Sequence, residues 1–491
     1  MRRIARLRSL ALAAVLPVVL CACGGPEGGA ADDSAEAVLV TAEVLRENVD
    51  ILYGLASIER YNPPRASRLF AYAYVALYEG WVRGVPGLET LVGRLNGLDA
   101  LPEPEAGVAY DWPTVALTAE LGVVSLILEG AQPFSLFELE TFVERQIEAR
   151  REAGVGGGVV ERSQQYGEAL AEALSAWADA DRYAERWDLN EYEPGRTEGS
   201  WVPTADYGMS IPLNQVTQMV QLFEEDDWRE VRESDELRSE WLSDRMLLTA
   251  RPSTITNPNT ALEPGWRHLR PFVLSSVAEV APPGPYPYAT DPESDFYRDA
   301  YEVYRVSKEL TGFDFATGHY WADLPAQTGT PAGHWLKIAM ATVEQNEVAF
   351  PQALQALTLT AVAFADAFIA CWDTKYGTDV VRPVTYIREQ IDPTWVPVIV
   401  TPPFPEYTAG HSVQSFAAAQ TLTGLFGDLG FTDDTHVTRY GFPARTYGSF
   451  LEAAQEASDS RLYGGIHYPK GLADGDRQGA RIGELVVERL R

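Results

Sequence analysis

Residues 460–467 read Ser-Arg-Leu-Tyr-Gly-Gly-Ile-His, and this stretch decides the fold and the site that we expect. Arg461 and His467 are six positions apart, or ~600° around an ideal helix, so an unbroken helix would face them away from each other. Gly464 and Gly465 lie between them and permit a break that turns both side chains inward. The pattern predicts a helix end that presents a guanidinium and an imidazole together.

Two stretches upstream carry matching groups. Lys375, one of only four lysines, precedes Arg382, and we expect Gly377 to interrupt the helix between them. Pro383 restricts Arg382 to an extended or turn backbone. Further along, a helix that begins near Gly410-His411 would point free backbone N–H groups at an anion.

The three stretches together supply three permanent cations, two imidazoles and a glycine at a helix start. A buried phosphate-like anion needs cations and hydrogen-bond donors to replace its water. One imidazole can attack phosphorus or bind the metal of an oxyanion, and a second can move protons. We therefore predict that these side chains converge on one small tetrahedral oxyanion.

At this point the sequence resembles the vanadium-dependent haloperoxidase and type-2 phosphatidic acid phosphatase (PAP2) superfamily. The superfamily signature is Lys-x6-Arg-Pro, then Ser-Gly-His, then Ser-Arg-x3-Gly-x-His, and all three parts are recognisable here. Flanking stretches at 62–71, 333–335 and 365–375 resemble the bacterial haloperoxidase-like branch, so the likeness covers nearly the whole mature chain. It implies a mainly α fold, a helical-bundle haloperoxidase/PAP2-like architecture with an irregular loop-rich insertion.

The resemblance also implies roles for the residues. His467 would be the axial ligand of the vanadium in vanadate, or the nucleophile of a phosphatase. His411 would be the acid–base residue, and Lys375 would also polarise bound peroxide. The residues that hold the cofactor would be Lys375, Arg382, Gly410, Arg461 and His467.

Two positions depart from the family pattern. Ala409 replaces the usual Ser before Gly-His, which removes one hydroxyl donor worth ~1–3 kcal/mol unless Thr408 or Ser412 compensates. Gly471 stands where many relatives carry an Asp four residues after the ligand histidine. We expect a backbone carbonyl or Asp474 to orient that histidine instead.

Three functions stay open at this stage. The leading prediction is a vanadate-dependent haloperoxidase that oxidises halide with hydrogen peroxide. The alternatives are a PAP2-type acid phosphatase that hydrolyses a phosphomonoester through a phosphohistidine, with phosphate in the same site, and a lipid-anchored oxyanion-binding protein without turnover. The chain has 39 Lys and Arg against 70 Asp and Glu, a net charge of −31, which argues against a nucleic-acid partner.

The N-terminus reads as an export signal. Residues 1–22 carry four arginines followed by a short apolar run, as in a bacterial signal peptide, and the sequence before Cys23 resembles a lipoprotein box. We expect lipidation at Cys23, a flexible tether over 23–38, and a location in the bacterial cell envelope on a lipid anchor. With three cysteines, no intrachain disulfide is expected, and a homodimer is compatible with the chain.

Apolar spacing predicts two helical regions. Residues 39–290 form the first, with a loop-rich segment over 183–290 that is rich in Trp, Tyr, Pro and Asp, and 291–491 form a C-terminal bundle that carries the oxyanion site. One half-buried strand is expected at 395–400. Helices are expected at 39–58, 65–82, 113–130, 136–152, 159–182, 293–310, 334–347, 352–371, 411–426, 446–463 and 473–491.

Smaller features receive structural interpretations. The apolar helix at 352–371 contains an aspartate, which favours a buried bundle helix over a membrane span. Three glycines at four-residue spacing near the C-terminus predict a flat face for close helix packing: Gly475, Gly479 and Gly483. His268 and His436 are expected at the surface, and His319 and His334 are expected as core or wall groups.

Overall fold

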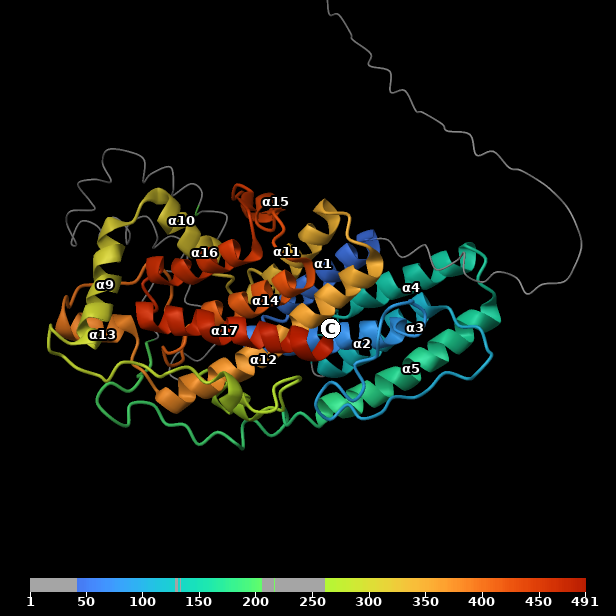
Figure 1. Ribbon diagram of the computed structural model, residues 1–491, viewed down its shortest axis with the longest axis horizontal. Helices are drawn as coiled ribbons and strands as arrows, with labels where there is room; N and C mark the ends of the chain where they lie inside the picture. The colour runs from blue at the N-terminus through green and yellow to red at the C-terminus, as the bar shows by residue number, and fades with distance from the viewer. Residues whose placement is uncertain (1–41, 129–130, 133, 205–215, 217–260) are drawn as a thin grey trace, which may run out of the picture. The chain divides into compact units, whose positions relative to one another are not determined.

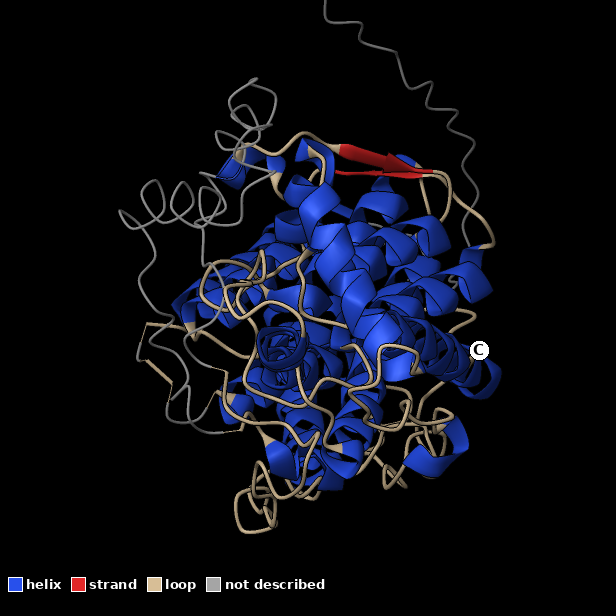
Figure 2. Cartoon of the chain, turned by 90° about the vertical axis from the view of Figure 1, so that its left-hand side faces the viewer, coloured by secondary structure: helices blue, strands red, loops and turns tan. Residues whose placement is uncertain are grey.

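Helices make up most of the regular structure in the part of the chain that the computed structural model describes (Figures 1 and 2). The described residues are 42–128, 131–132, 134–204, 216 and 261–491. The mainly α class is therefore confirmed. The signal peptide, the lipidation at Cys23, the tether and much of the loop-rich segment lie outside the described residues and stay predictions.

Capping residues and prolines explain where individual helices begin. Asn62 caps helix α2 (Pro63–Trp81) by accepting from the N–H of Arg65, and Asp111 caps α3 (Trp112–Ile127) in the same way. The other helices before residue 290 are α1 (Ala42–Ile58), α4 (Phe137–Glu152), α5 (Gly157–Asp179) and the short 3₁₀ helices η3 (Pro264–His268) and η4 (Val277–Val280).

The second half of the chain carries most of the remaining helices. They are α9 (Asp295–Glu309), α10 (Gly312–Tyr320), α11 (Thr330–Gln345), α12 (Phe350–Thr378), α13 (Pro383–Gln390), α14 (Gly410–Phe426), α15 (Val437–Tyr440), α16 (Phe450–Tyr463) and α17 (Pro469–Leu490). The short helices α10 and α13 were not expected from apolar spacing. A capping box of Thr311 and Asp314 starts α10, and Pro383 starts α13.

Regular strands in the described residues are limited to an antiparallel pair, β1 (Phe431–Asp433) and β2 (Arg445–Tyr447). The strand predicted at 395–400 is wrong: this stretch is a loop whose Val398 and Ile399 N–H groups both bond to the carbonyl of Gly464. The alternating apolar side chains there face the bundle without a partner strand.

Helix α12 lies at the centre of the bundle, packed against α2, α14 and α17 (Figure 1). It is long and apolar enough to cross a membrane, but 94% of its most apolar window is buried inside the protein. Asp366 in this helix accepts three hydrogen bonds, from the N–H groups of Phe272, Val273 and Leu274 at 2.6, 2.8 and 2.9 Å. The interpretation as a buried bundle helix is confirmed. Because α2 and α12 pack together, contacts cross residue 290, and the predicted division there stays untested.

The glycine face on α17 packs directly on α14, as predicted. A Cβ at Gly475, Gly479 or Gly483 would lie 2.8 Å from Ser412 Cβ, 2.1 Å from the Val413 carbonyl oxygen and 2.6 Å from the Ala417 carbonyl oxygen, respectively. These distances leave no room for a side chain, so the backbones of α14 and α17 are in contact. The start of α14 is thereby held next to the loop that precedes α17.

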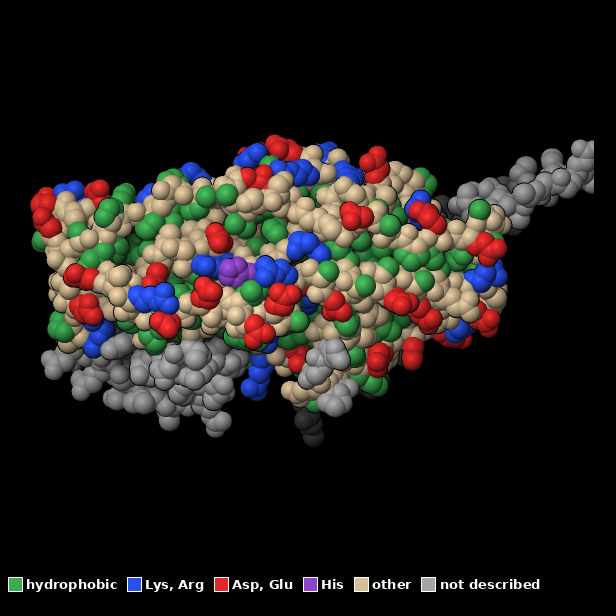
Figure 3. Space-filling model, turned by 90° about the horizontal axis from the view of Figure 1, so that it is seen from below, with side chains coloured by type: hydrophobic (Ala, Val, Ile, Leu, Met, Phe, Trp, Pro, Cys, Tyr) green, Lys and Arg blue, Asp and Glu red, His purple; other side chains and the backbone are tan. Residues whose placement is uncertain are grey.

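The face of the protein in Figure 3 is mixed in charge. On the face shown in Figure 3, acidic and basic side chains are interspersed with apolar and neutral ones. The basic groups of the C-terminal stretches are instead buried: Lys375, Arg382 and Arg461 are each at most 1% exposed. Buried cations that are not each paired with a carboxylate destabilise the folded protein, so they indicate a functional site.

Candidate oxyanion site

Lys375 lies in the last turn of α12. The expected helix break at Gly377 is wrong, because α12 continues to Thr378 and the backbone turns only at Asp379, with φ 54°. The Lys375 Nζ donates to the carbonyls of Pro405, Glu406 and Thr408 at 3.1, 2.9 and 2.5 Å. Burial lowers the pKa of Lys375 to about 7, and the nearby Arg382 acts in the same direction.

Arg382 stands at the N-terminus of α13, where Pro383 holds it in an extended backbone as expected. Its Nε donates to the Phe404 carbonyl at 2.8 Å, and its Nη1 donates to the Ile466 carbonyl at 2.9 Å. The same Nη1 lies 3.1 Å from His467 Nε2. Its Nη2 is buried and has no hydrogen-bond partner among the described residues. Burial lowers the pKa of Arg382 to about 10.

His467 follows the predicted break, since α16 ends at Tyr463 and Gly465 adopts φ 73°. A guanidinium can only donate, so the contact with Arg382 leaves the Nε2 of His467 unprotonated. The other nitrogen, Nδ1, then carries the proton and donates to Glu406 Oε1 at 2.8 Å. Burial, followed by the charges of nearby cations, holds the pKa of His467 well below its usual value.

Arg461 and His411 complete the group. Arg461, in the last turn of α16, donates from Nη2 to the Gly318 carbonyl at 2.9 Å, and burial lowers its pKa to about 9. Helix α14 begins at Gly410 without a side-chain cap, as expected. His411 Nε2 is buried without a partner in the described structure, and burial and then Arg461 hold the pKa of His411 well below its usual value.

The structure brings the sequence-predicted residues together. The groups whose positive forms lower the pKa of His467 are Arg382, Lys375, His411 and Arg461, so all four lie within electrostatic reach of one ring. Gly410 stands beside His411 at the same helix start. The geometry thus supplies the shared cluster that an oxyanion site requires, while the roles of its members remain proposals.

Glu406 is a member of the cluster that sequence reasoning missed. Its Oε1 accepts from His467 Nδ1 and from the Tyr468 N–H at 3.1 Å, and burial raises the pKa of its carboxyl to about 7. A Cβ at Gly471 would lie 2.4 Å from Glu406 Oε1. The glutamate therefore occupies the space into which a side chain at 471 would project.

The other expected replacements fail. Asp474 does not orient His467, because its carboxylate accepts from Tyr407 Oη at 2.6 Å and from Lys470 Nζ at 2.7 Å. Thr408 donates to Gln478 at 2.7 Å, and Ser412 bonds to Ser458 at 2.6 Å, so both hydroxyls are engaged with neighbouring helices. Neither hydroxyl is therefore free to replace the serine hydroxyl that is missing at Ala409.

The remaining histidines divide differently from the prediction. His268 is partly exposed, in keeping with a surface group, but His436 is fully buried, so its surface assignment is wrong. The rings of Tyr320, His334 and Phe442 pack on it, and its Nε2 lies 3.4 Å from Asp323 Oδ1. His319 and His334 are buried as expected, although His319 Nε2 has no hydrogen-bond partner among the described residues.

One protein family and several solved structures are similar to this chain. The family described as the VCPO second helical-bundle domain matches residues 355–491, which contain every member of the cluster. The crystal structure of the first bacterial vanadium-dependent iodoperoxidase is 32% identical, with a TM-score of 0.75, over 92% of this chain and 97% of that chain. The chain belongs to the vanadium-dependent haloperoxidase family.

More distant members of the family share the fold. The apo and holo forms of a bacterial vanadium-dependent chloroperoxidase are each 15% identical to this chain, with TM-scores of 0.59 and 0.60. They cover 86% and 88% of this chain and 92% and 93% of their own. A comparison with curated proteins found no match. The mainly α haloperoxidase architecture expected from the sequence is confirmed.

Proposed function

We propose that this protein is a vanadate-dependent haloperoxidase that oxidises halide with hydrogen peroxide, with Nε2 of His467 as the protein ligand of vanadium. One observation carries the proposal. The Nε2 lone pair is kept unprotonated by Arg382 and faces a buried cluster of cations. A neutral imidazole is the form that binds a metal.

The residues fit vanadate by charge and by donor count. Lys375, Arg382 and Arg461 are buried, and their lowered pKa values show that the surrounding protein does not compensate their charges fully. Arg382 Nη2 and His411 Nε2 are buried atoms without partners among the described residues. A multiply charged oxyanion would satisfy these groups, and vanadate when bound supplies an electrophilic centre that activates peroxide toward halide.

The chain's own side chains would position the reactants and move protons. His411 is neutral near pH 7 because its pKa lies well below the usual value, so its free nitrogen can accept a proton from hydrogen peroxide. Lys375 has a pKa of about 7 in the anion-free protein, and a bound anion would favour its charged form. The protonated amine would then polarise bound peroxide.

Activity after adding back the cofactor tests the proposal. The protein is purified without vanadate and assayed for halogenation of a dye with hydrogen peroxide and iodide, bromide or chloride, after addition of orthovanadate or phosphate. We expect halogenation with orthovanadate and none with phosphate. His467→Ala should abolish it, and His268→Ala, the same change at a partly exposed ring, should leave it unchanged.

Three outcomes would reject the proposal. Halogenation that persists in His467→Ala would exclude this ring as the ligand. Absence of halogenation, together with hydrolysis of a phosphomonoester that vanadate inhibits, would point to the PAP2-type reaction through a phosphohistidine. Tight anion binding with neither reaction would leave an oxyanion-binding protein.

We also propose that the protein is exported and anchored in the cell envelope by acyl chains on Cys23. The support is the signal-like composition of residues 1–22 and the small residue before Cys23. Labelling with a radioactive fatty acid and fractionation of membranes test it. Cys23→Ser should lose the label and release the protein from the membrane fraction, whereas Cys371→Ser, a change at a buried free cysteine, should keep the label.

A further inference from the structure

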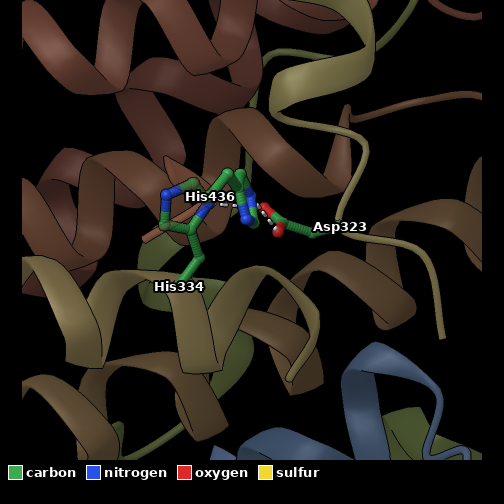
Figure 4. Close-up of side chains that lie close together, drawn as sticks. All are labelled: Asp323, His334 and His436. Atoms are coloured by element: carbon green, nitrogen blue, oxygen red, sulfur yellow. Dashed lines mark hydrogen bonds and ion pairs between the residues drawn. The ribbon is translucent and has the colours of Figure 1, made fainter. Parts of the chain in front are cut away.

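A second group of side chains of metal-ligating types lies within electrostatic reach of His411 and Arg461. It joins Asp323 in the loop after α10, His334 on α11 and His436 at the start of α15, and all three are fully buried or nearly so. Figure 4 shows the Asp323 carboxylate directed at the rings of His334 and His436. One ligand atom of each residue lies within 4.8 Å of the others.

The hydrogen bonds of this group are incomplete. His334 Nδ1 lies 2.9 Å from Asp323 Oδ2, and His436 Nε2 lies 3.4 Å from Asp323 Oδ1. Both ring nitrogens of His436, and Asp323 Oδ1, are buried without a hydrogen-bond partner in the described structure. A histidine ring that is 0% exposed and has neither nitrogen satisfied is costly unless a ligand completes it.

Two separations in this group lie near those around a small divalent metal, and the ligand atoms of all three residues lie within 4.8 Å of one another. Zinc binds histidine nitrogen and carboxylate oxygen at ~2.0–2.2 Å, so neighbouring ligand atoms in a tetrahedral site lie ~3.3 Å apart. The separations of 2.9 and 3.4 Å measured from the Asp323 oxygens lie on either side of this value. A single ion could therefore contact all three residues after small side-chain adjustments.

Asp433 supplies the outer support that such sites use. Its Oδ2 lies 2.8 Å from His334 Nε2, the nitrogen that faces away from Asp323, and it also accepts from Tyr320 Oη at 2.5 Å. Its Oδ1 accepts from the N–H and hydroxyl of Thr435 at 3.0 and 2.6 Å. A carboxylate on the far nitrogen of a ligating histidine fixes the ring orientation and raises its basicity.

We propose that Asp323, His334 through Nδ1, and His436 bind a divalent transition metal of the zinc type, with Asp433 orienting His334. The ion would replace the proton between His334 and Asp323 and would satisfy the free nitrogen of His436. Two imidazoles and one carboxylate form a donor set that suits zinc and its neighbours and disfavours calcium or magnesium.

The proposed ion would be linked to the oxyanion site through Trp321 and Asp323. The His334 ring stacks on Trp321 at 4.6 Å, and the charge of Asp323 acts on both Arg461 and His411. Arg461 in turn bonds to the Gly318 carbonyl in α10. A metal at this place would fix the loop after α10 against the back of the oxyanion site.

Cobalt substitution tests the proposal on the complete protein. The purified protein is analysed for zinc, stripped with a chelator and titrated with Co²⁺, and the visible absorption of tetrahedral cobalt is recorded. We expect about one zinc per chain and an intense tetrahedral cobalt spectrum. His436→Asn should abolish the spectrum, and Asp433→Asn should weaken cobalt binding by about 10–100-fold.

Matched controls locate the ion. His268→Asn and His467→Asn make the same change outside the proposed site and should keep the cobalt spectrum. A cobalt spectrum that persists in His436→Asn would overturn the assignment. So would a spectrum that is lost in His467→Asn but not in His436→Asn. The wild-type titration decides the matter without any variant: no zinc and no tetrahedral spectrum would show that protons alone hold this cluster.

Discussion

Replacing Glu406 by glutamine should weaken vanadate binding while leaving the fold intact. The glutamine oxygen can still accept from His467 Nδ1, so the ring keeps its tautomer, but above pH 7, where Glu406 is ionised, the negative charge that makes the ring a stronger ligand is lost. Changes of this kind cost about 10–100-fold in affinity, or about 1.4 to 2.7 kcal/mol. Glu406→Ala should cost more, since it leaves the buried Nδ1–H without an acceptor.

The neighbouring glycine offers a way to restore the carboxylate from another position. A Cβ at Gly471 would lie 2.4 Å from Glu406 Oε1, and an aspartate carboxylate oxygen lies about 2.4 Å from its own Cβ. An aspartate at 471 can therefore place an oxygen where Glu406 Oε1 now stands, provided that the glutamate is removed. The double variant Glu406→Ala/Gly471→Asp should recover most of the affinity that Glu406→Ala loses, whereas Gly471→Asp alone should be destabilised by the clash.

Equilibrium titration with orthovanadate, read as recovered halogenation activity, gives the affinities, and thermal unfolding reports the fold. If Glu406→Gln binds vanadate as tightly as the wild type, the charge of Glu406 does not strengthen His467 as a ligand. The reasoning is refuted if the double variant is folded but no better than Glu406→Ala, because the carboxylate would then have no role in holding the histidine.

Three further predictions concern stability. Lys375→Met should remove a pH-dependent contribution to stability. The pKa of Lys375 in the folded protein, about 7, lies below that of a free lysine, so above pH 7 the unfolded chain binds a proton that the folded chain does not. In urea titrations at pH 7 and 8.5, the free energy of unfolding of the anion-free wild type should therefore rise, relative to the variant, by up to about 1.4 kcal/mol per pH unit. Asp366→Ala leaves three buried N–H groups without an acceptor and should cost about 3 to 5 kcal/mol by urea unfolding. Gly479→Ala places a Cβ 2.1 Å from the Val413 carbonyl oxygen, should cost about 3 kcal/mol and should weaken vanadate binding, because α14 must move.

Each of these has a control. For lysine, equal pH slopes in variant and wild type would contradict the assigned titration. For the aspartate, Asp366→Asn keeps one acceptor oxygen and should lose less stability than Asp366→Ala. For the glycine, Gly377→Ala lies in α12 where a Cβ meets nothing within 4 Å, so it should be neutral or slightly stabilising.

The sequence allowed prediction of those parts of the site that depend on the backbone preferences of glycine and proline. Gly464 and Gly465 between Arg461 and His467 permitted a turn, and Pro383 restricted Arg382 to an extended or turn backbone; a turn at Gly465 and an extended Arg382 are both present. The break expected at Gly377 was wrong because a single glycine costs a helix only about 1 kcal/mol, which the burial of α12 easily outweighs.

Long-range contacts could not be predicted in the same way. Glu406 and His467 are 61 positions apart, and only the folded loop shows that the glutamate fills the place of the missing aspartate. His436 looked like a surface residue because its neighbours in the sequence are polar, yet the rings of Tyr320 and His334, about 100 positions away in the chain, pack on it and bury it. The polarity of the neighbouring residues does not show which distant part of the chain packs over a segment.

The glycine face of α17 has a consequence for how this protein can change over time. Elsewhere in the bundle, a larger side chain on one helix can be offset by a smaller one on its neighbour. At Gly479 and Gly483 the opposing groups are carbonyl oxygens, which every residue type carries, so no substitution on α14 can make room. The spacing between the two helices is therefore set by backbone contact, and exchanging side chains on α14 cannot change it.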